Sequence, residues 1–162
     1  MELLLIRHGK AEAHGHPSGD GARDLVEKGE GQSRKVGRFL KREGLVPDLA
    51  LTSPLVRAKR TAEIVCETAG VEGKPVVENW LSCGMRPEVA LKELAVYKDT
   101  CRTVALFGHE PDFSGLVEHL IGADYGSVRV KKASVILLSV DLRGGQGLLH
   151  FNIWPTQLPG VG

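Results

Sequence analysis

Two histidines and two arginines stand out because each lies at or just beyond the end of an apolar segment. Arg7 and His8 follow the apolar run 3–6 in LLLIRHG, Arg57 follows DLALTS in SPLVRAKRTA, and His109 follows TVALFG in LFGHEPD. Guanidinium groups bind phosphate oxygens through directed N–H donors and neutralise the charge of a phosphoryl group. A neutral imidazole among them can attack phosphorus, and neighbouring cations help to keep it neutral. The four residues therefore predict phosphoryl transfer in which arginines supply the positive charge and no metal or other cofactor is required.

Alternating strand-like and helix-like segments must bring these four side chains together. We expect strands at residues 3–6, 48–53, 74–78 and 103–108, helices at 25–43, 53–70, 87–96 and 111–122, and an antiparallel pair at 133–142 and 147–154. Repeated strand–helix units imply an α/β fold, with a mainly parallel sheet covered by helices on both faces and a C-terminal antiparallel hairpin. In such folds ligands bind beyond the carboxyl ends of the strands, where the four side chains are expected.

The bulk composition indicates a single domain over residues 1–162, with 155–162 expected to be a loose C-terminal tail. A formal net charge of +1 gives no overall field that would attract nucleic acid or a membrane surface, so neither is an expected partner. Three widely separated cysteines form no disulfide or zinc pattern and favour a reducing compartment. The first apolar run is too short for a signal peptide or a membrane span, so we expect a cytoplasmic protein.

Three segments together resemble the histidine phosphatase superfamily, a group with a phosphoglycerate mutase-like fold. They are LLLIRHGKAE, LTSPLVRAKRTAEIV and LFGHEPDFSGLV, which occur in that order up to about residue 121. The short chain is most similar to the SixA-type branch, the phosphohistidine phosphatases. The resemblance implies that His8 is the nucleophile and becomes a phosphohistidine, that Arg7 and Arg57 hold the phosphoryl group, and that His109 completes the pocket. It also implies a doubly covered sheet with one antiparallel strand.

The sequence departs from many members of this superfamily after the third strand, where they carry an acid that protonates the leaving oxygen. VENWLSCGMRPE lacks the longer segment that holds this acid, which leaves Glu78 and Glu110 as candidates. An alkoxide is a poor leaving group and needs a well-placed acid. Phosphoimidazole protonated on its far nitrogen departs as neutral imidazole, so the missing acid favours phosphohistidine on a protein as the substrate, and hence a histidine-phosphotransfer role.

Two other functions stay open. One is a small-molecule phosphomonoesterase with Glu78 or Glu110 as its acid; the other is a regulatory module that binds phosphate without turnover. The partner is accordingly a phosphorylated histidine-containing protein domain or a small phosphorylated molecule. Gly9 is expected to allow close approach of the backbone to the ligand. The loop residues His14, His16 and Asp20 match no zinc pattern, and solvation is the favoured interpretation for them.

Overall fold

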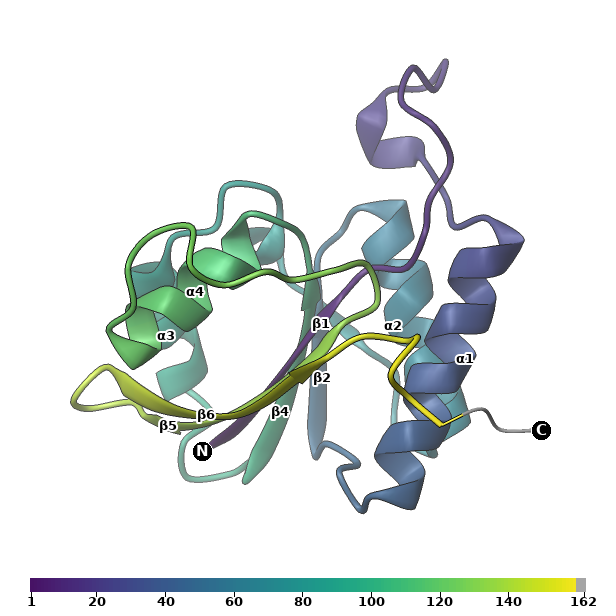
Figure 1. Ribbon diagram of the computed structural model, residues 1–162. Coiled ribbons are helices and arrows are strands. Elements are labelled where there is room, and N and C mark those ends of the chain that lie inside the picture. Colours follow the sequence, from purple (N-terminus) through teal and green to yellow (C-terminus); the bar gives the residue numbers. More distant parts are fainter. Residues whose placement is uncertain (160–162) are drawn as a thin grey trace.

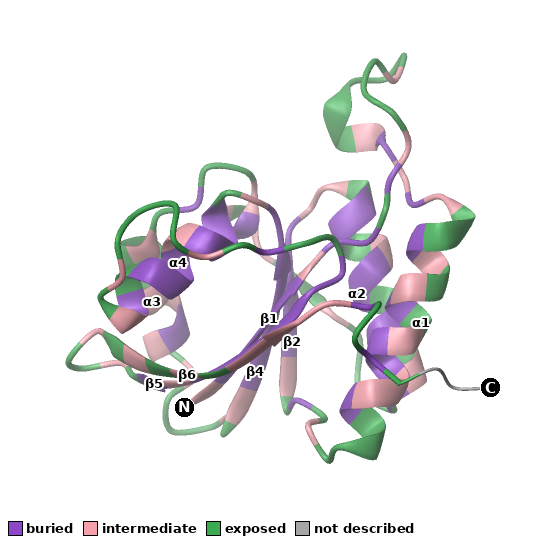
Figure 2. Cartoon of the chain, in the orientation of Figure 1, coloured by how far each residue is buried: buried purple, intermediate pink, exposed green. Residues whose placement is uncertain are grey.

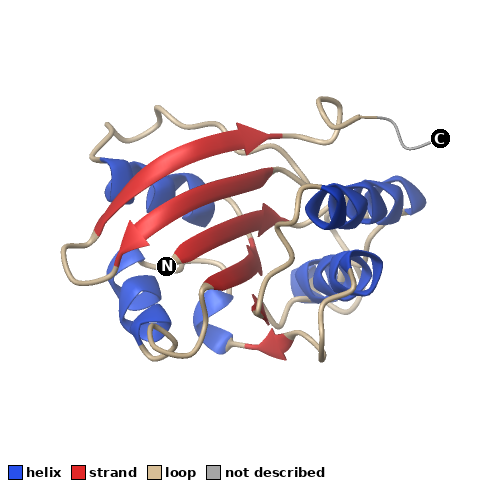
Figure 3. Cartoon of the chain, turned by 90° about the horizontal axis from the view of Figure 1, so that it is seen from below, coloured by secondary structure: helices blue, strands red, loops and turns tan. Residues whose placement is uncertain are grey.

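The central sheet has six strands in the order β3-β2-β4-β1-β5-β6 (Figure 3). The computed structural model describes residues 1–159. The strands are β1 (Glu2–Arg7), β2 (Leu49–Thr52), β3 (Val76–Val77), β4 (Thr103–Gly108), β5 (Val135–Asp141) and β6 (Gln146–Ile153). β1, β2, β3 and β4 pair in parallel, whereas β5 pairs antiparallel with both β1 and β6. This confirms the predicted α/β class and its single antiparallel strand.

Two helices cover each face of the sheet (Figure 1). Helices α1 (Glu27–Arg42) and α2 (Val56–Ala69) pack together on one face, while α3 (Pro87–Ala95) and α4 (Asp112–Ile121) cover the other. Side chains of a strand alternate between faces, so Leu3 and Leu5 of β1 enter the core under α3 and α4, and Leu4 and Ile6 enter the core under α1 and α2. All four are fully buried (Figure 2). A strand buried on both faces explains the unbroken apolar run of the sequence.

The helix starts differ from the prediction at both prolines. Pro54 and Pro111 were expected inside the first turns, but α2 begins at Val56 and α4 at Asp112, so both prolines precede the helical residues. The predicted third strand, 74–78, is reduced to two residues that pair with β2 at the sheet edge. Helix α1 begins at Glu27, and its Gly29 packs against the backbone of Lys10, where a Cβ atom would clash.

A bulge in the β5–β6 pair changes the predicted faces of the last strand. Leu149, Phe151 and Ile153 were expected on one covered face. The register shifts between Leu137 and Leu138, so Leu149 packs with the core under α3 and α4, whereas Phe151 joins the opposite core. An extra residue in one strand reverses its alternation from that point on.

The predicted loose tail is wrong for its first residues. Pro155 and Leu158 are buried, and Leu158 packs into the core under α1 and α2. The Leu158 N–H donates to Pro155 O at 3.3 Å, and the Gln157 N–H donates to Trp154 O at 2.8 Å. The remainder of that tail, 160–162, lies outside the described residues. Among residues 1–159, no helix is both long and apolar enough to cross a membrane.

Candidate active site

Three adjacent strands deliver the four predicted side chains to one pocket. β1 ends at Arg7 and β4 at Gly108, and these two residues face each other in the parallel register, so His8 and His109 follow side by side. β2 lies on the other side of β4 and leads into α2, which carries Arg57 in its first turn. The pocket at this edge has a volume of about 300 Å³ and is lined by Arg7, His8, Ala11, His14, Asp20, Arg23, Arg57, Cys83, His109, Glu110 and Lys132.

The His8 ring is oriented for nucleophilic attack. Its Nδ1–H donates to the Gly9 carbonyl oxygen at 2.8 Å, since a carbonyl can only accept. The neutral ring therefore carries its lone pair on Nε2. The pKa of His8 is lowered to about 3, first by burial and then by the nearby His109, Arg57 and Arg7, against the opposing effect of the Gly9 bond. A neutral imidazole with a free Nε2 is the reactive form of a histidine nucleophile.

Three buried side-chain nitrogen atoms in this pocket have no protein partner. One outer nitrogen of each arginine is held: Arg7 Nη1 donates to Val130 O at 2.9 Å, and Arg57 Nη1 donates to Asp20 O at 2.9 Å. Arg7 Nε, Arg57 Nε and His109 Nδ1 are inaccessible to solvent and unbonded. Leaving buried donors unsatisfied costs about 1–3 kcal/mol each, so such a cluster points to a ligand with several acceptor oxygens.

His109 lies 5.3 Å from His8 between ring centroids, with the ring planes tilted by 55°. Its Nε2 is 2.8 Å from the hydroxyl of Ser53. The residue is 2% exposed, and burial, followed by the charges of Arg57 and Arg7, lowers the pKa of His109 to about 4. The sequence allows a second histidine that is protonated and donates a hydrogen bond to the phosphoryl oxygens. The pKa instead makes this ring neutral near pH 7, because an arginine-rich buried pocket disfavours another cation.

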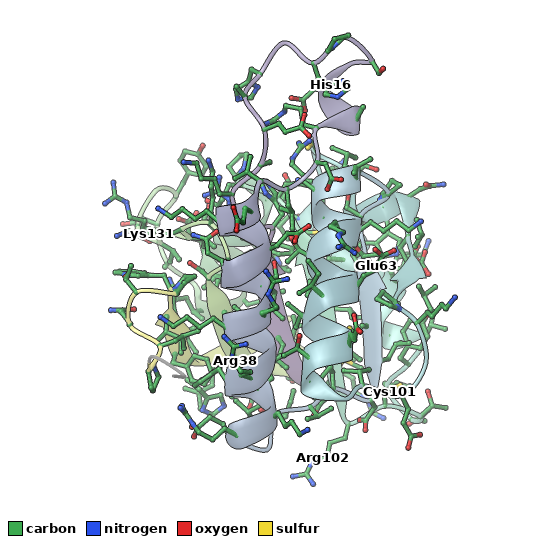
Figure 4. All side chains as sticks on the ribbon, turned by 90° about the vertical axis from the view of Figure 1, so that its right-hand side faces the viewer. His16, Arg38, Glu63, Cys101, Arg102 and Lys131 are labelled. Carbon is green, nitrogen blue, oxygen red and sulfur yellow. The ribbon has the colours of Figure 1, made fainter. Side chains whose placement is uncertain are left out.

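Asp20 belongs to this site, which sequence reasoning missed. It lies in the one-turn helix η1 (Asp20–Ala22), within the long loop after β1. Its Oδ2 accepts from Arg57 Nη2 at 3.1 Å and its Oδ1 from Arg23 Nε at 2.7 Å. These hydrogen bonds, first that of Arg23, lower the pKa of Asp20. The expectation of a merely solvated residue is therefore wrong for Asp20, while His16 lies on the projecting part of the loop (Figure 4).

Of the two candidate acids, Glu110 lies in the pocket and Glu78 lies outside it. Glu110 lines the pocket, and its Oε1 accepts the Ser114 N–H near the start of α4 at 2.7 Å. Burial raises the pKa of Glu110, against the lowering effects of Ser114 and Arg7. Glu78 does not line the pocket and directly precedes the short helix η2 (Asn79–Leu81). The pKa of Tyr97 is raised mainly by burial and then by the charge of Glu78, which therefore lies near that phenol.

Gly9 makes close contacts within the protein, and its predicted close approach to a ligand stays a prediction. Its carbonyl holds His8, its N–H donates to Thr61 Oγ1 at 3.1 Å, and it is not part of the pocket lining. A Cβ atom at Gly9 would lie 2.7 Å from Gly29 O, so the missing side chain lets the strand end pack against α1. At Gly108 a Cβ would lie 2.9 Å from the Phe113 ring. Both glycines make room for protein atoms.

Lys132 and Cys83 also line the pocket, and neither was predicted to do so. The segment RVKK, residues 129–132, is typical of a solvated run, but its Lys132 reaches the pocket, where burial, together with Arg7, Lys10 and Arg23, lowers the pKa of Lys132. Cys83 Sγ lies 4.0 Å from Arg57 Nη2. Neither residue type carries a sequence signal of its own. Within residues 1–159, His, Cys, Asp and Glu form no group of three that could hold a metal ion.

Comparison with known proteins defines the class to which this fold and pocket belong. The model of the histidine phosphatase superfamily (branch 1) matches residues 3–79. An uncharacterised protein from Picosynechococcus sp. is 32% identical over 142 residues, covering 84% of this chain and 83% of that protein. The chain belongs to the histidine phosphatase superfamily.

Two named proteins resemble it in different ways. A 2,3-bisphosphoglycerate-dependent phosphoglycerate mutase from Thermobifida fusca is 44% identical over 80 residues, which are 48% of this chain and 32% of the mutase. The matched part thus spans about a third of that relative. The structure of the protein histidine phosphatase SixA complexed with tungstate superposes with a TM-score of 0.88 over 98% of this chain and 100% of the SixA chain, at 22% identity. The likeness to SixA therefore extends over the whole fold.

Proposed function

We propose that this protein is a metal-independent phosphatase that removes the phosphoryl group from phosphohistidine on another protein. The observation that carries the proposal is the group of three buried, unbonded nitrogen atoms, Arg7 Nε, Arg57 Nε and His109 Nδ1, in the same pocket as the His8 ring; both arginine atoms are N–H donors. A phosphoryl group offers several acceptor oxygens to such donors and a phosphorus atom to the nucleophile. The complete set favours turnover over simple binding, because a binding module does not need the nucleophile.

In the first step the His8 Nε2 lone pair attacks phosphorus. An N–P bond forms to His8 while the N–P bond of the substrate breaks, and its electron pair returns to the departing imidazole. Because that imidazole is already protonated on its far nitrogen, it leaves as a neutral ring. Throughout this step the Gly9 carbonyl holds the His8 ring through Nδ1. The two arginines bind the phosphoryl oxygens while the phosphoryl group is transferred.

In the second step water hydrolyses the phosphoenzyme. The water oxygen bonds to phosphorus, the His8 N–P bond breaks with its electron pair returning to Nε2, and inorganic phosphate is released. The water's second proton stays on the phosphate or passes to solvent. The burial that lowers the pKa of His8 also regenerates the neutral nucleophile, since it disfavours a protonated ring.

Phosphohistidine suits this site because its leaving group, a neutral imidazole, does not need an acid from the protein. Glu110 is the one predicted acid in the pocket, and one of its oxygens is engaged by the N–H of Ser114. The structural likeness to SixA points the same way. Three unpaired cysteines, Cys66, Cys83 and Cys101, are consistent with the reducing cytoplasm in which we place this activity.

A second candidate function is hydrolysis of a small phosphate ester, and one observation favours it. Burial raises the pKa of Glu110, which increases the share of its protonated form, the form that a general acid needs. The sequence match to a phosphoglycerate mutase is compatible with this alternative. In this reaction Glu110 would protonate the departing alkoxide, and His8 would attack as before.

Parallel turnover measurements separate the two functions. The purified protein is assayed with a phosphohistidine-containing phosphotransfer domain, with p-nitrophenyl phosphate and with a series of phosphosugars, and His8→Ala is the inactive control. The proposal predicts that kcat/KM is highest for the phosphohistidine domain. A phosphosugar that is hydrolysed faster than the phosphohistidine domain would select the small-molecule function.

A further inference from the structure

Ser53 and His109 are neighbours because each follows one of two paired strands. Thr52 of β2 faces Phe107 of β4 in the register, and the Ser53 N–H extends the ladder by donating to Phe107 O at 3.0 Å. The Ser53 side chain is fully buried and its Oγ lies 2.8 Å from His109 Nε2. The sheet therefore fixes this contact across 56 residues of sequence.

The direction of the Ser53–His109 hydrogen bond follows from the protons available. The Leu55 N–H donates to Ser53 Oγ at 3.2 Å, which occupies one acceptor site of the hydroxyl. Among the hydrogen bonds of residues 1–159, the hydroxyl proton has no acceptor other than His109 Nε2. Either direction leaves one donor unpaired in the free protein, because His109 Nδ1 has no protein partner. With a phosphoryl oxygen accepting at Nδ1, only Ser53 donating to Nε2 satisfies every donor, so the proton of the neutral His109 ring resides on Nδ1.

The Nδ1 atom is the one that needs this proton. It is buried in the pocket wall without any protein partner, beside the two unbonded arginine Nε atoms. With a proton, Nδ1 donates to a phosphoryl oxygen; in the other tautomer it would direct a lone pair at that oxygen and repel it. A single hydrogen bond from Ser53 therefore decides whether His109 attracts or repels the substrate.

We propose that Ser53 is a positioning residue that fixes His109 in the Nδ1–H tautomer, so that the ring binds the phosphoryl group as a neutral donor. This inference rests on the function proposed above for the pocket. It names a role for a residue outside the lining and replaces the expected imidazolium with an oriented neutral ring. The mechanism parallels other enzymes in which the hydrogen bond at one ring nitrogen determines the state of the other.

The charges around His109 support a neutral ring. The pocket around it holds an excess of cations over carboxylates. Arg7, Arg57, Arg23 and Lys132 are the cations, Asp20 and Glu110 are the carboxyl groups, and the neighbouring His8 ring is neutral. Its pKa of about 4 leaves roughly one molecule in a thousand protonated at pH 7 before substrate binds. Tautomer selection matters only for a neutral imidazole, because the imidazolium carries protons on both nitrogens.

The direct test is the tautomer itself, measured with inorganic phosphate bound in the pocket and no phosphohistidine substrate present. The protein is labelled with ¹⁵N-histidine, long-range ¹H–¹⁵N spectra are recorded at pH 7, and His109 is assigned from the spectrum of His109→Gln. The wild type should show a protonated Nδ1 and an unprotonated Nε2. A protonated Nε2 in the wild type would overturn the proposal, whatever the activity and whether or not any variant folds.

Three serine variants then test whether the hydroxyl sets this preference. Ser53→Ala should give a mixture of His109 tautomers and lower kcat/KM by about tenfold. A tenfold loss corresponds to the free energy of one hydrogen bond near the upper end of its usual range. Ser53→Thr keeps the hydroxyl and should restore the wild-type ring spectrum. Ser33→Ala is the matched control, because Ser33 is equally buried and its hydroxyl donates to Gly29 O, outside the pocket.

The outcomes also separate this inference from the proposed function. A wild-type Nδ1–H tautomer without phosphohistidine turnover would refute the function and leave the role of Ser53 intact. Turnover together with an unchanged His109 tautomer in folded Ser53→Ala would refute the role of Ser53 and leave the function intact. A tautomer change in Ser33→Ala would also refute the role, because the preference would then depend on general packing.

Discussion

Replacing His8 should change how the free energy of unfolding depends on pH. The pKa of His8 is about 3 in the folded protein and about 6.5 for an unperturbed histidine. Below pH 6.5 the His8 imidazole binds a proton in the unfolded chain but stays unprotonated in the folded chain, so acid favours unfolding. This contribution is absent above pH 6.5 and its cost grows as the pH falls towards 3. At pH 5, 1.5 units below the unfolded value, it amounts to about 2 kcal/mol.

The assay is urea denaturation of wild type and His8→Gln at pH 7.5 and pH 5. Between these two pH values the free energy of unfolding should fall by about 2 kcal/mol more for the wild type than for His8→Gln, because only the wild type has an imidazole at this position that is protonated on unfolding. His119→Gln, at an exposed position on α4, controls for the loss of an imidazole and should follow the wild type. Equal losses in wild type and His8→Gln would refute the reasoning that burial keeps the nucleophile neutral.

Three further predictions concern turnover. Glu110→Gln should leave kcat/KM for phosphohistidine within about tenfold, a change below roughly 1.4 kcal/mol, with Glu78→Gln as the matched carboxylate outside the pocket; a larger loss for Glu110→Gln alone would make Glu110 the acid. Asp20→Asn should raise KM more than it lowers kcat, because the carboxylate bonded to Arg57 Nη2 helps to position that guanidinium for ground-state binding; an unchanged KM would refute this role. EDTA should leave the rate unchanged, since Arg7 and Arg57 supply the positive charge; a chelated, inactive enzyme restored by a divalent ion would contradict it.

The strand ends and the four site residues could be predicted because their signals are local. A buried parallel strand appears as an unbroken apolar run, as in 3–6 and 103–108, and the residues after it must meet at one edge of the sheet. Arg7, His8 and His109 follow such runs directly, and Arg57 lies in the first turn of the helix that comes next. Topology alone then brings them to the same pocket.

The remaining features depend on contacts between distant segments. Asp20 reaches Arg57 across 37 residues through a long loop whose sequence suggests only solvation. Gly108 is required by the ring of Phe113, and the bulge in the β5–β6 pair moves Phe151 to the other face. The low pKa of His109 results from its burial among cations, which no local pattern reveals.

The most direct test of the central claim is chemical trapping of the phosphoenzyme. Wild type and His8→Ala are mixed with a ³²P-labelled phosphohistidine domain, quenched within the first turnover and separated from it, and the bound phosphate is tested in acid and in base. The account predicts an acid-labile, base-stable phosphate on the wild type, mapped by mass spectrometry to His8, and none on His8→Ala, whose arginines still bind phosphate. Near-normal turnover by folded His8→Ala, or a trapped phosphate on another residue, would contradict it.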